Sequence, residues 1–327
     1  MRTSSLDAAC IGKVPTHGDF VRHRASTPTM RAFDEWIHDG LRRARKRHDS
    51  AWEEADDAPP PTRFLFSARD GQAPNVLLGV LRASRDRNGR AYPFAVTCEL
   101  PKSSVRVDQL ANLPLQADAF YTEAEHIVHE ATDENLPYRE VTDRVEEVNP
   151  TFTLQSSPPT GYNQFLEQHT VGSFLEALFG HFEDGRKYRL FKNLFDIFLP
   201  QRKRDTPQLN YGLQFPLGDG EAPVAKTACF WLDTTLHLLD HSDTEYSFFW
   251  TSDSRDSASS FLLLFLGPPR AEALTHLSGS DGKNEEIYKL EHTGSENDAQ
   301  AALSIPEKYG SLIENKQLCL RDFLQRL

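Results

Sequence analysis

The stretch that decides the fold is NVLLGVLRA (residues 75–83), followed without a break by SRDRNGR (84–90) and AYPFAVTCEL (91–100). The two outer segments are apolar and rich in β-branched and aromatic residues, which predicts two strands. The segment between them is charged and contains Asn88-Gly89, a dipeptide favoured where both central residues of a tight turn need positive φ. The sequence therefore predicts a hairpin-like pair of strands joined by a rigid, charged turn.

The pattern extends in both directions from this hairpin. Further strands are predicted over residues 9–14, 62–67, 246–250 and 261–266. Helical spacing predicts a helix over residues 30–46, capped by Thr29, and others over 110–132, 173–182, 188–199 and 224–240, with a weaker amphipathic stretch over 309–327. Apolar strands interspersed with helices indicate a layered α/β/α sandwich, and hairpin-like connections indicate a mixed sheet.

Composition excludes several classes of protein. The 327 residues carry 36 basic and 48 acidic side chains, a net charge of −12. Nucleic-acid binding is not expected, because contacts to phosphates need a basic surface. The longest strongly apolar run has six residues (261–266), whereas a membrane span needs about twenty. The N-terminus lacks the apolar stretch of a signal peptide, and four isolated cysteines suggest no disulfide framework. We therefore expect a cytoplasmic protein that is not an integral membrane protein.

A second loop motif, GKVPTHGDF, occupies residues 12–20. It lacks the spacing of a phosphate-binding loop. Charged residues in loops held by a rigid scaffold are typical of recognition sites. In the other loop, Asp86 lies among Arg85, Arg87 and Arg90, which predicts an ion-pair network that fixes the loop. A rigid display of arginines suits carboxylate or phosphate groups on a partner.

The residue types for an enzyme are also present. His17 and Asp19 form a general-base pair with Ser84 as nucleophile if folding brings them together. Alternatively, Asp19 closes its own turn through Asx-type hydrogen bonds or pairs with an arginine. His126 and His129 are spaced to share a helix face, but no further metal ligand lies nearby in the sequence. No metal, no cofactor and no catalytic residue is predicted.

The two loop motifs resemble the type VI secretion system-associated TagF/ImpM family, with order and spacing matched over residues 8–100. The matching positions also include Trp36, in a helix that resembles the family's aromatic-rich helix. The resemblance implies an α/β/α domain over 8–276, with its motif-bearing part at 8–140. The composition of the chain predicts a possible linker or insertion near 150–162. The chain is longer than the family pattern, with extra sequence near 140–220 and a partly helical C-terminal extension at 277–327. The residues expected at the motif or partner-binding site are Lys13, Pro15, Gly18, Asp19, Phe20, Trp36, Ser84, Asp86, Arg87, Gly89 and Arg90.

The resemblance also implies a function. Family members are cytoplasmic accessory proteins without established enzymatic activity, and they act mainly as post-translational repressors of type VI secretion. They bind the forkhead-associated scaffold protein of the system and are linked to its Ser/Thr kinase–phosphatase pathway. The resemblance thus favours a regulatory binding protein. A hydrolase that uses His17, Asp19 and Ser84 and a structural subunit of the secretion assembly remain alternatives.

Overall fold

The computed structural model describes residues 6–46, 59–69, 71, 73–205, 207–218, 223–240, 244–251, 260–277, 286–292 and 297–327. Within these ranges the strands form one nine-stranded sheet. In spatial order the strands are β2 (Val21–His23), β1 (Ala8–Gly12), β5 (Phe94–Pro101), β4 (Asn75–Arg82), β3 (Thr62–Ser67), β7 (Tyr246–Thr251), β8 (Ser260–Leu266), β6 (Gly212–Gly218) and β9 (Ile287–Lys289). Only β6 and β9 pair in parallel, so the sheet is mixed, as predicted.

The predicted hairpin lies near the centre of the N-terminal half of this sheet. Strands β4 and β5 pair antiparallel from Asn75 opposite Pro101 to Arg82 opposite Phe94. Strand β3 joins β4 on one side and β7 on the other, so segments about 180 residues apart in sequence become neighbours. Strands β2, β6 and β9 were not predicted.

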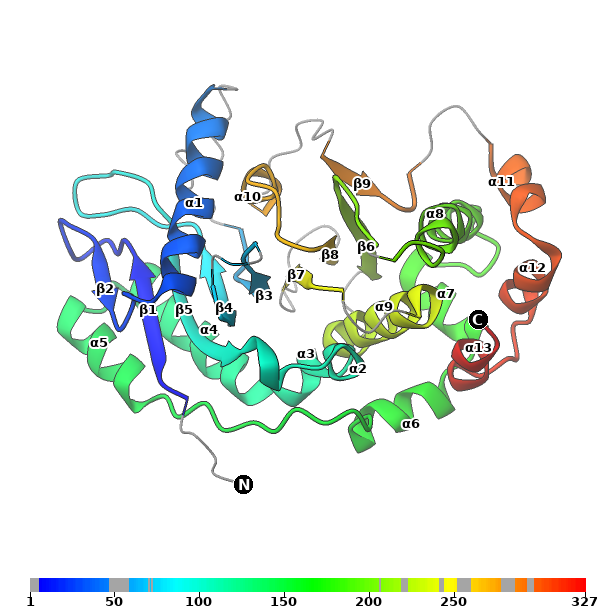
Figure 1. The fold of residues 1–327 in the computed structure, drawn as a ribbon, viewed down its shortest axis with the longest axis horizontal. Coiled ribbons are helices and arrows are strands. Elements are labelled where there is room, and N and C mark those ends of the chain that lie inside the picture. The colour runs from blue at the N-terminus through cyan, green and yellow to red at the C-terminus, as the bar shows by residue number, and fades with distance from the viewer. Residues whose placement is uncertain are drawn as a thin grey trace.

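Side chains of the central strands alternate between two apolar layers. In β3, Leu65 faces one layer, while Phe64 and Phe66 face the other. The second layer is covered by α1 (Pro28–Lys46) and α10 (Ala273–Leu277), which lie above the sheet in Figure 1. Most other helices cover the opposite face, and the predicted α/β/α layering is thus confirmed. These are α2 (Val107–Leu110), α3 (Leu113–Gln116), α4 (Asp118–Thr132), α5 (Tyr138–Glu147), α6 (Thr160–Gln168), α7 (Val171–Phe179), α8 (Arg186–Gln201) and α9 (Val224–Leu239).

Three details of the predicted helices were wrong. The stretch 110–132 is divided among α2, α3 and α4, because Pro114 lacks the N–H that a continuous helix would need. Helix α1 is capped by Thr27, whose hydroxyl accepts a hydrogen bond from the Met30 N–H at 3.1 Å. Thr29 is instead buried within the first turn. The stretch 309–327 forms two helices with a turn between them.

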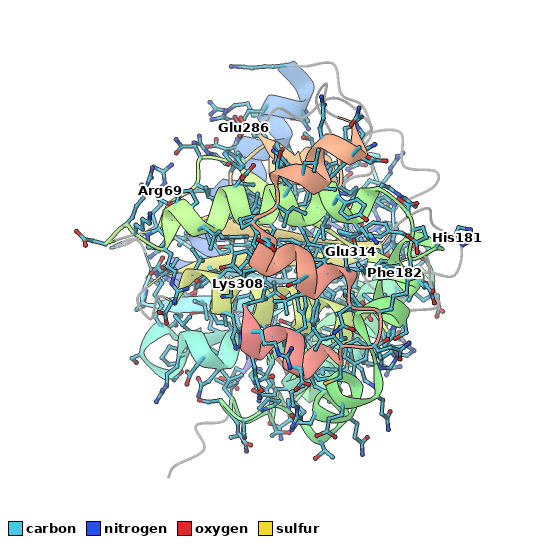
Figure 2. All side chains as sticks on the ribbon, turned by 90° about the vertical axis from the view of Figure 1, so that its right-hand side faces the viewer. Arg69, His181, Phe182, Glu286, Lys308 and Glu314 are labelled. Atoms are coloured by element: carbon cyan, nitrogen blue, oxygen red, sulfur yellow. The ribbon has the colours of Figure 1, made fainter. Side chains whose placement is uncertain are left out.

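The C-terminal helices pack on the end of the molecule that faces the viewer in Figure 2. They are α11 (Asp298–Ser304), α12 (Glu307–Glu314) and α13 (Leu320–Arg326). The fully buried Lys187 of α8 holds this contact, with its Nζ 3.6 Å from the centre of the Phe182 ring and 3.3 Å from a carboxylate oxygen of Glu314. A short 3₁₀ turn, η1 (Lys102–Ser104), follows β5. No helix in the described ranges is both long and apolar enough to cross a lipid bilayer.

Candidate functional site

The two loop motifs lie against each other at the left-hand end of the sheet in Figure 1. The Arg87 N–H donates to the carbonyl of His17 at 2.9 Å, and the Arg90 guanidinium donates to the carbonyl of Gly18 at 2.7 Å. We call this unit, residues 13–20 together with 84–92, the braced corner. Its two halves are about seventy residues apart in sequence, and β1 and β5, from which they extend, are paired in the sheet.

A buried carboxylate holds the braced corner together. The Asp86 side chain is fully buried, and one of its oxygens lies 3.1 Å from Lys13 Nζ and 2.7 Å from Arg90 Nε. The other oxygen accepts hydrogen bonds from the backbone N–H groups of Asn88 (2.9 Å) and Arg90 (3.0 Å). Of the predicted ion pairs around Asp86, the one with Arg90 is present, and Lys13 is a further member that the sequence did not indicate.

The electrostatics of Asp86 follow from these contacts. Burial by itself raises the pKa of a carboxyl group. Hydrogen bonds from the Arg90 backbone, from the Lys13 and Arg90 side chains and from the Asn88 backbone outweigh it, and the pKa of Asp86 is lowered to about 2. Asp86 is thus an anion at neutral pH that orders the loop.

Backbone hydrogen bonds also fix the turn. The Asp86 N–H donates to Arg90 O at 3.1 Å, and the Gly89 N–H donates to Asp86 O at 2.8 Å. Gly89 has a φ of +79°, but Asn88 is not among the described residues with positive φ, so the expectation of two such residues was wrong. This turn has one left-handed residue, as in hairpin loops that end in a glycine bulge. Every amide from Asp86 to Arg90 therefore has a hydrogen-bond acceptor.

Close backbone contact joins the first loop to the sheet at Gly12, which has a φ of +134°. A Cβ atom at this position would lie 2.1 Å from the Pro93 carbonyl oxygen. Only glycine allows this approach. At Gly18 the steric need for glycine is weaker, because a Cβ atom there would lie 3.3 Å from the Arg87 guanidinium, which belongs to a flexible side chain.

Aromatic side chains connect the braced corner to α1. Phe20 lies edge-on to Tyr92, with Lys13 Nζ 5.3 Å and the Arg22 guanidinium 5.6 Å from its ring centre. The Tyr92 hydroxyl donates to the Asp34 carboxylate, which also pairs with Arg22 at 2.6 Å. Sequence reasoning missed Arg22 and Asp34, although Asp34 is adjacent to the aromatic helix motif.

The other predicted site residues differ in exposure. Asp19, Arg87, Gly89 and Arg90 are exposed, and the Arg90 side chain remains 59% accessible despite its bond to Asp86. Pro15 is half-buried in the first loop. Trp36 lies elsewhere, in the apolar layer under α1, where its Nε1 donates to Arg270 O at 2.9 Å.

The residues of the hydrolase alternative make separate contacts. The His17 ring stacks on Tyr138 with centroids 4.7 Å apart, and Asp19 accepts a hydrogen bond from the Phe20 N–H at 2.8 Å. The Ser84 hydroxyl is buried and has no hydrogen-bond partner. Across the described part of the chain, no hydrogen bond links His17, Asp19 and Ser84 to one another.

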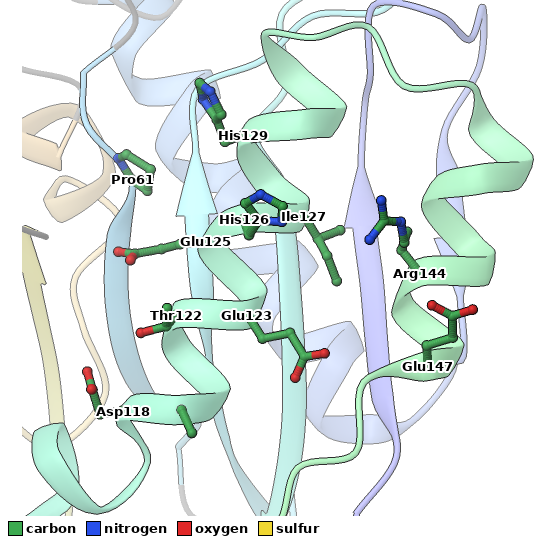
Figure 3. Close-up of a pocket in the computed structure, with 11 residues that line it drawn as sticks. Pro61, Asp118, Thr122, Glu123, Glu125, His126, Ile127, His129, Arg144 and Glu147 are labelled. Carbon is green, nitrogen blue, oxygen red and sulfur yellow. The ribbon is translucent and has the colours of Figure 1, made fainter.

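A broad groove of about 820 Å³ lies on a different surface, along α4 and α5. Figure 3 shows polar and charged side chains from both helices around it, among them Glu123, His126, Arg144 and Glu147. The His129 imidazole lies 2.8 Å from an Asp133 carboxylate oxygen. Within the described ranges, no group of three or more His, Cys, Asp or Glu side chains is arranged to hold a metal ion. None of the predicted site residues lines this groove.

Comparison with known proteins identifies the N-terminal part of the chain. Residues 9–148 match the TagF N-terminal domain, described as type VI secretion system-associated. No curated protein matches the chain. The crystal structure of PA0076 from Pseudomonas aeruginosa PAO1 is similar, with a TM-score of 0.49 and 18% identity over 85% of this chain and 96% of that one. The braced corner lies wholly inside the matched segment. Residues 9–148 of the chain therefore form a region that matches the type VI secretion system-associated TagF N-terminal domain.

Proposed function

We propose that the chain is a non-enzymatic cytoplasmic regulator that represses type VI secretion by binding a component of the secretion machinery. The observation that carries the proposal is the braced corner, in which exposed arginines lie on a turn whose five backbone N–H groups, from Asp86 to Arg90, are all hydrogen-bonded. A loop that is already ordered loses little conformational entropy when a partner binds. This geometry favours recognition.

The charged side chains exposed on the braced corner indicate which chemical groups a partner would present. Arg87 and Arg90 are the exposed cations of the second loop, and Asp19 is the exposed anion of the first. The guanidinium group binds carboxylate or phosphate oxygens in a planar, two-pronged arrangement. Arg87 and Arg90 provide a local cationic contact on a chain whose net charge is −12.

The forkhead-associated scaffold protein of the secretion system is the proposed partner, through the Ser/Thr kinase–phosphatase pathway that controls it. The similarity to the TagF N-terminal domain supports this choice, and the exposed arginines match a partner that presents anionic groups. Repression would follow if the bound scaffold is withheld from assembly.

The test is a binding measurement between the purified chain and the forkhead-associated scaffold protein. Arg87→Glu reverses an exposed charge without touching the buried Asp86, and we expect it to weaken binding by at least about tenfold. Arg106→Glu is the matched control, because Arg106 is also exposed and lies outside the braced corner. Equal affinities for Arg87→Glu, Arg106→Glu and the unmodified chain would refute the braced corner as the contact surface.

The hydrolase alternative has less support. His17 and Asp19 contact different partners, and the Ser84 hydroxyl that would act as nucleophile is buried without a hydrogen-bond partner. A general base must lie within hydrogen-bond reach of the proton it removes, directly or through one water. We therefore propose that this site functions in binding.

A further inference from the structure

A small cavity of about 180 Å³ lies between the sheet and the segment that follows β5. Leu65 and Val76 line it from β3 and β4, and Leu110 lines it from α2. The start of β7 supplies Thr244 and Tyr246. This cavity is distinct from the braced corner, since the two share no residue.

Most of the cavity wall is apolar. Leu65, Val76 and Leu110 are buried, and Val105 and Val107 are partly buried against the same apolar layer. Lys102 and Glu245 are the charged residues of the lining, and they form an ion pair with each other. Their side chains are 24% and 28% exposed, so they mark the solvent side of the cavity. Because the two charges compensate each other, the cavity offers no net charge to a ligand.

Two hydroxyl groups in the lining lack hydrogen-bond partners. Tyr246 is 4% exposed and Thr244 is 6% exposed, yet Tyr246 Oη and Thr244 Oγ1 make no hydrogen bond. Burial raises the pKa of Tyr246, and a weaker hydrogen-bond-type interaction with the Thr244 side chain lowers it, so the two hydroxyls lie near each other without a hydrogen bond of normal geometry. A buried hydroxyl without a partner costs about 1–3 kcal/mol, so such groups are rare unless something else satisfies them.

We propose that this cavity binds a small neutral molecule that combines an apolar ring or short chain with one hydroxyl group. An apolar cavity of about 150 Å³ is known to hold a molecule of the size of benzene, and this one is slightly larger. The apolar wall takes the body of the ligand. The Tyr246 and Thr244 hydroxyls donate to and accept from its hydroxyl group. Because Lys102 and Glu245 neutralise each other, the cavity favours a ligand that carries no charge.

Phenol and toluene are suitable probes, since they share a ring and differ in the hydroxyl group. Binding to the full chain is measured by titration calorimetry and by chemical-shift changes near Tyr246. We expect both probes to bind saturably and phenol to bind more tightly. Tyr246→Phe keeps the shape of the wall and removes the hydroxyl, and we expect it to weaken phenol about fivefold while leaving toluene unchanged. Val105→Trp fills the cavity and is expected to abolish both.

Thr234→Val is the matched control, because the Thr234 hydroxyl is also buried without a partner but lies outside the cavity. This variant is expected to bind both probes like the unmodified chain. Three results would overturn the proposal: no saturable binding of either probe, equal loss of phenol affinity in Tyr246→Phe and Thr234→Val, or a crystal soaked in phenol that shows only water at the two hydroxyls. Tyr246→Phe is expected to fold, and its thermal unfolding verifies this independently of the probes. None of these measurements involves the secretion partner, so their outcome is independent of the proposed function.

Discussion

The braced corner and the cavity beside β7 differ in whether their buried polar groups have hydrogen-bond partners. At the corner, a carboxylate with no exposed surface meets two cationic side chains and two backbone N–H groups. In the cavity, two hydroxyls are almost as deeply buried and have no partner. Satisfied polar groups rigidify a structure, whereas unsatisfied ones are costly until a ligand or water reaches them. The braced corner is thus rigid, whereas the hydroxyls of the cavity can still form a further hydrogen bond.

The largest effect is expected from removing the carboxylate of the braced corner. Asp86→Ala leaves the Lys13 ammonium, whose side chain is only 9% exposed, without its counter-charge. Breaking a buried ion pair from one side costs about 3–5 kcal/mol. We expect a loss of that order in the free energy of unfolding, measured by chemical denaturation. A loss below about 1 kcal/mol would mean that Asp86 does not hold the corner together.

Two glycine substitutions distinguish the stability cost of a backbone clash from the cost of a positive φ alone. Gly12→Ala places a methyl group against the Pro93 carbonyl at a positive φ, and we expect a loss of about 2–4 kcal/mol. Gly89 also has a positive φ but has open space around it, so Gly89→Ala is expected to cost about 1 kcal/mol. Thermal unfolding of both variants measures the difference. Equal losses would contradict the close contact at Gly12.

The acid dependence of stability tests the same carboxylate without removing it. The pKa of Asp86 is about 2 in the folded chain, below its ordinary value of 3.8. A lowered pKa in the folded state stabilises the protein above the ordinary value, and this contribution is lost as pH falls through the folded one. We expect stability to decline between about pH 5 and pH 2, with a shallower decline in Asp86→Asn. Identical slopes would show that the Asp86 carboxylate is not stabilised by folding.

The smallest effect is expected from replacing two tyrosines by phenylalanine. The two differ in whether the hydroxyl has a hydrogen-bond partner. The buried Tyr121 hydroxyl donates to Phe64 O at 3.1 Å, so Tyr121→Phe should cost about 1 kcal/mol. Tyr246→Phe removes a hydroxyl without a partner and should leave stability unchanged or slightly increased. Denaturation of the two variants gives the comparison. A larger loss for Tyr246→Phe would reveal a hydrogen bond at the cavity and contradict the view of it as unsatisfied.

Local patterns predicted much of the fold. Strand β3 was placed over residues 62–67, and the β4–β5 hairpin follows from two apolar stretches around a turn. The short edge strands β2 and β9 were missed, because three residues carry too little periodicity. Strand β6 has a glycine at each end and Pro216 inside it. Because glycine and proline are unfavourable in strands, the sequence pattern did not indicate it. The division of the chain at residue 277 stays a prediction.

The candidate site was predicted in part for the same reason. The Asp86–Arg90 pair is local, four residues apart, and the charge pattern of the turn indicated it. Lys13 joins Asp86 across 73 residues, and no local pattern encodes that contact. The cavity depends on four separate segments that meet only in the folded chain, so its unpartnered hydroxyls could not be found from the sequence.

Hydrogen–deuterium exchange at the amides of residues 86–90 tests the rigidity of the braced corner most directly. All five N–H groups are bonded within the corner, although the turn is largely exposed. We predict exchange protection close to that of the neighbouring strands β4 and β5, and its loss in Asp86→Ala. Exchange at the rate of a free loop in the unmodified chain would contradict a rigid corner.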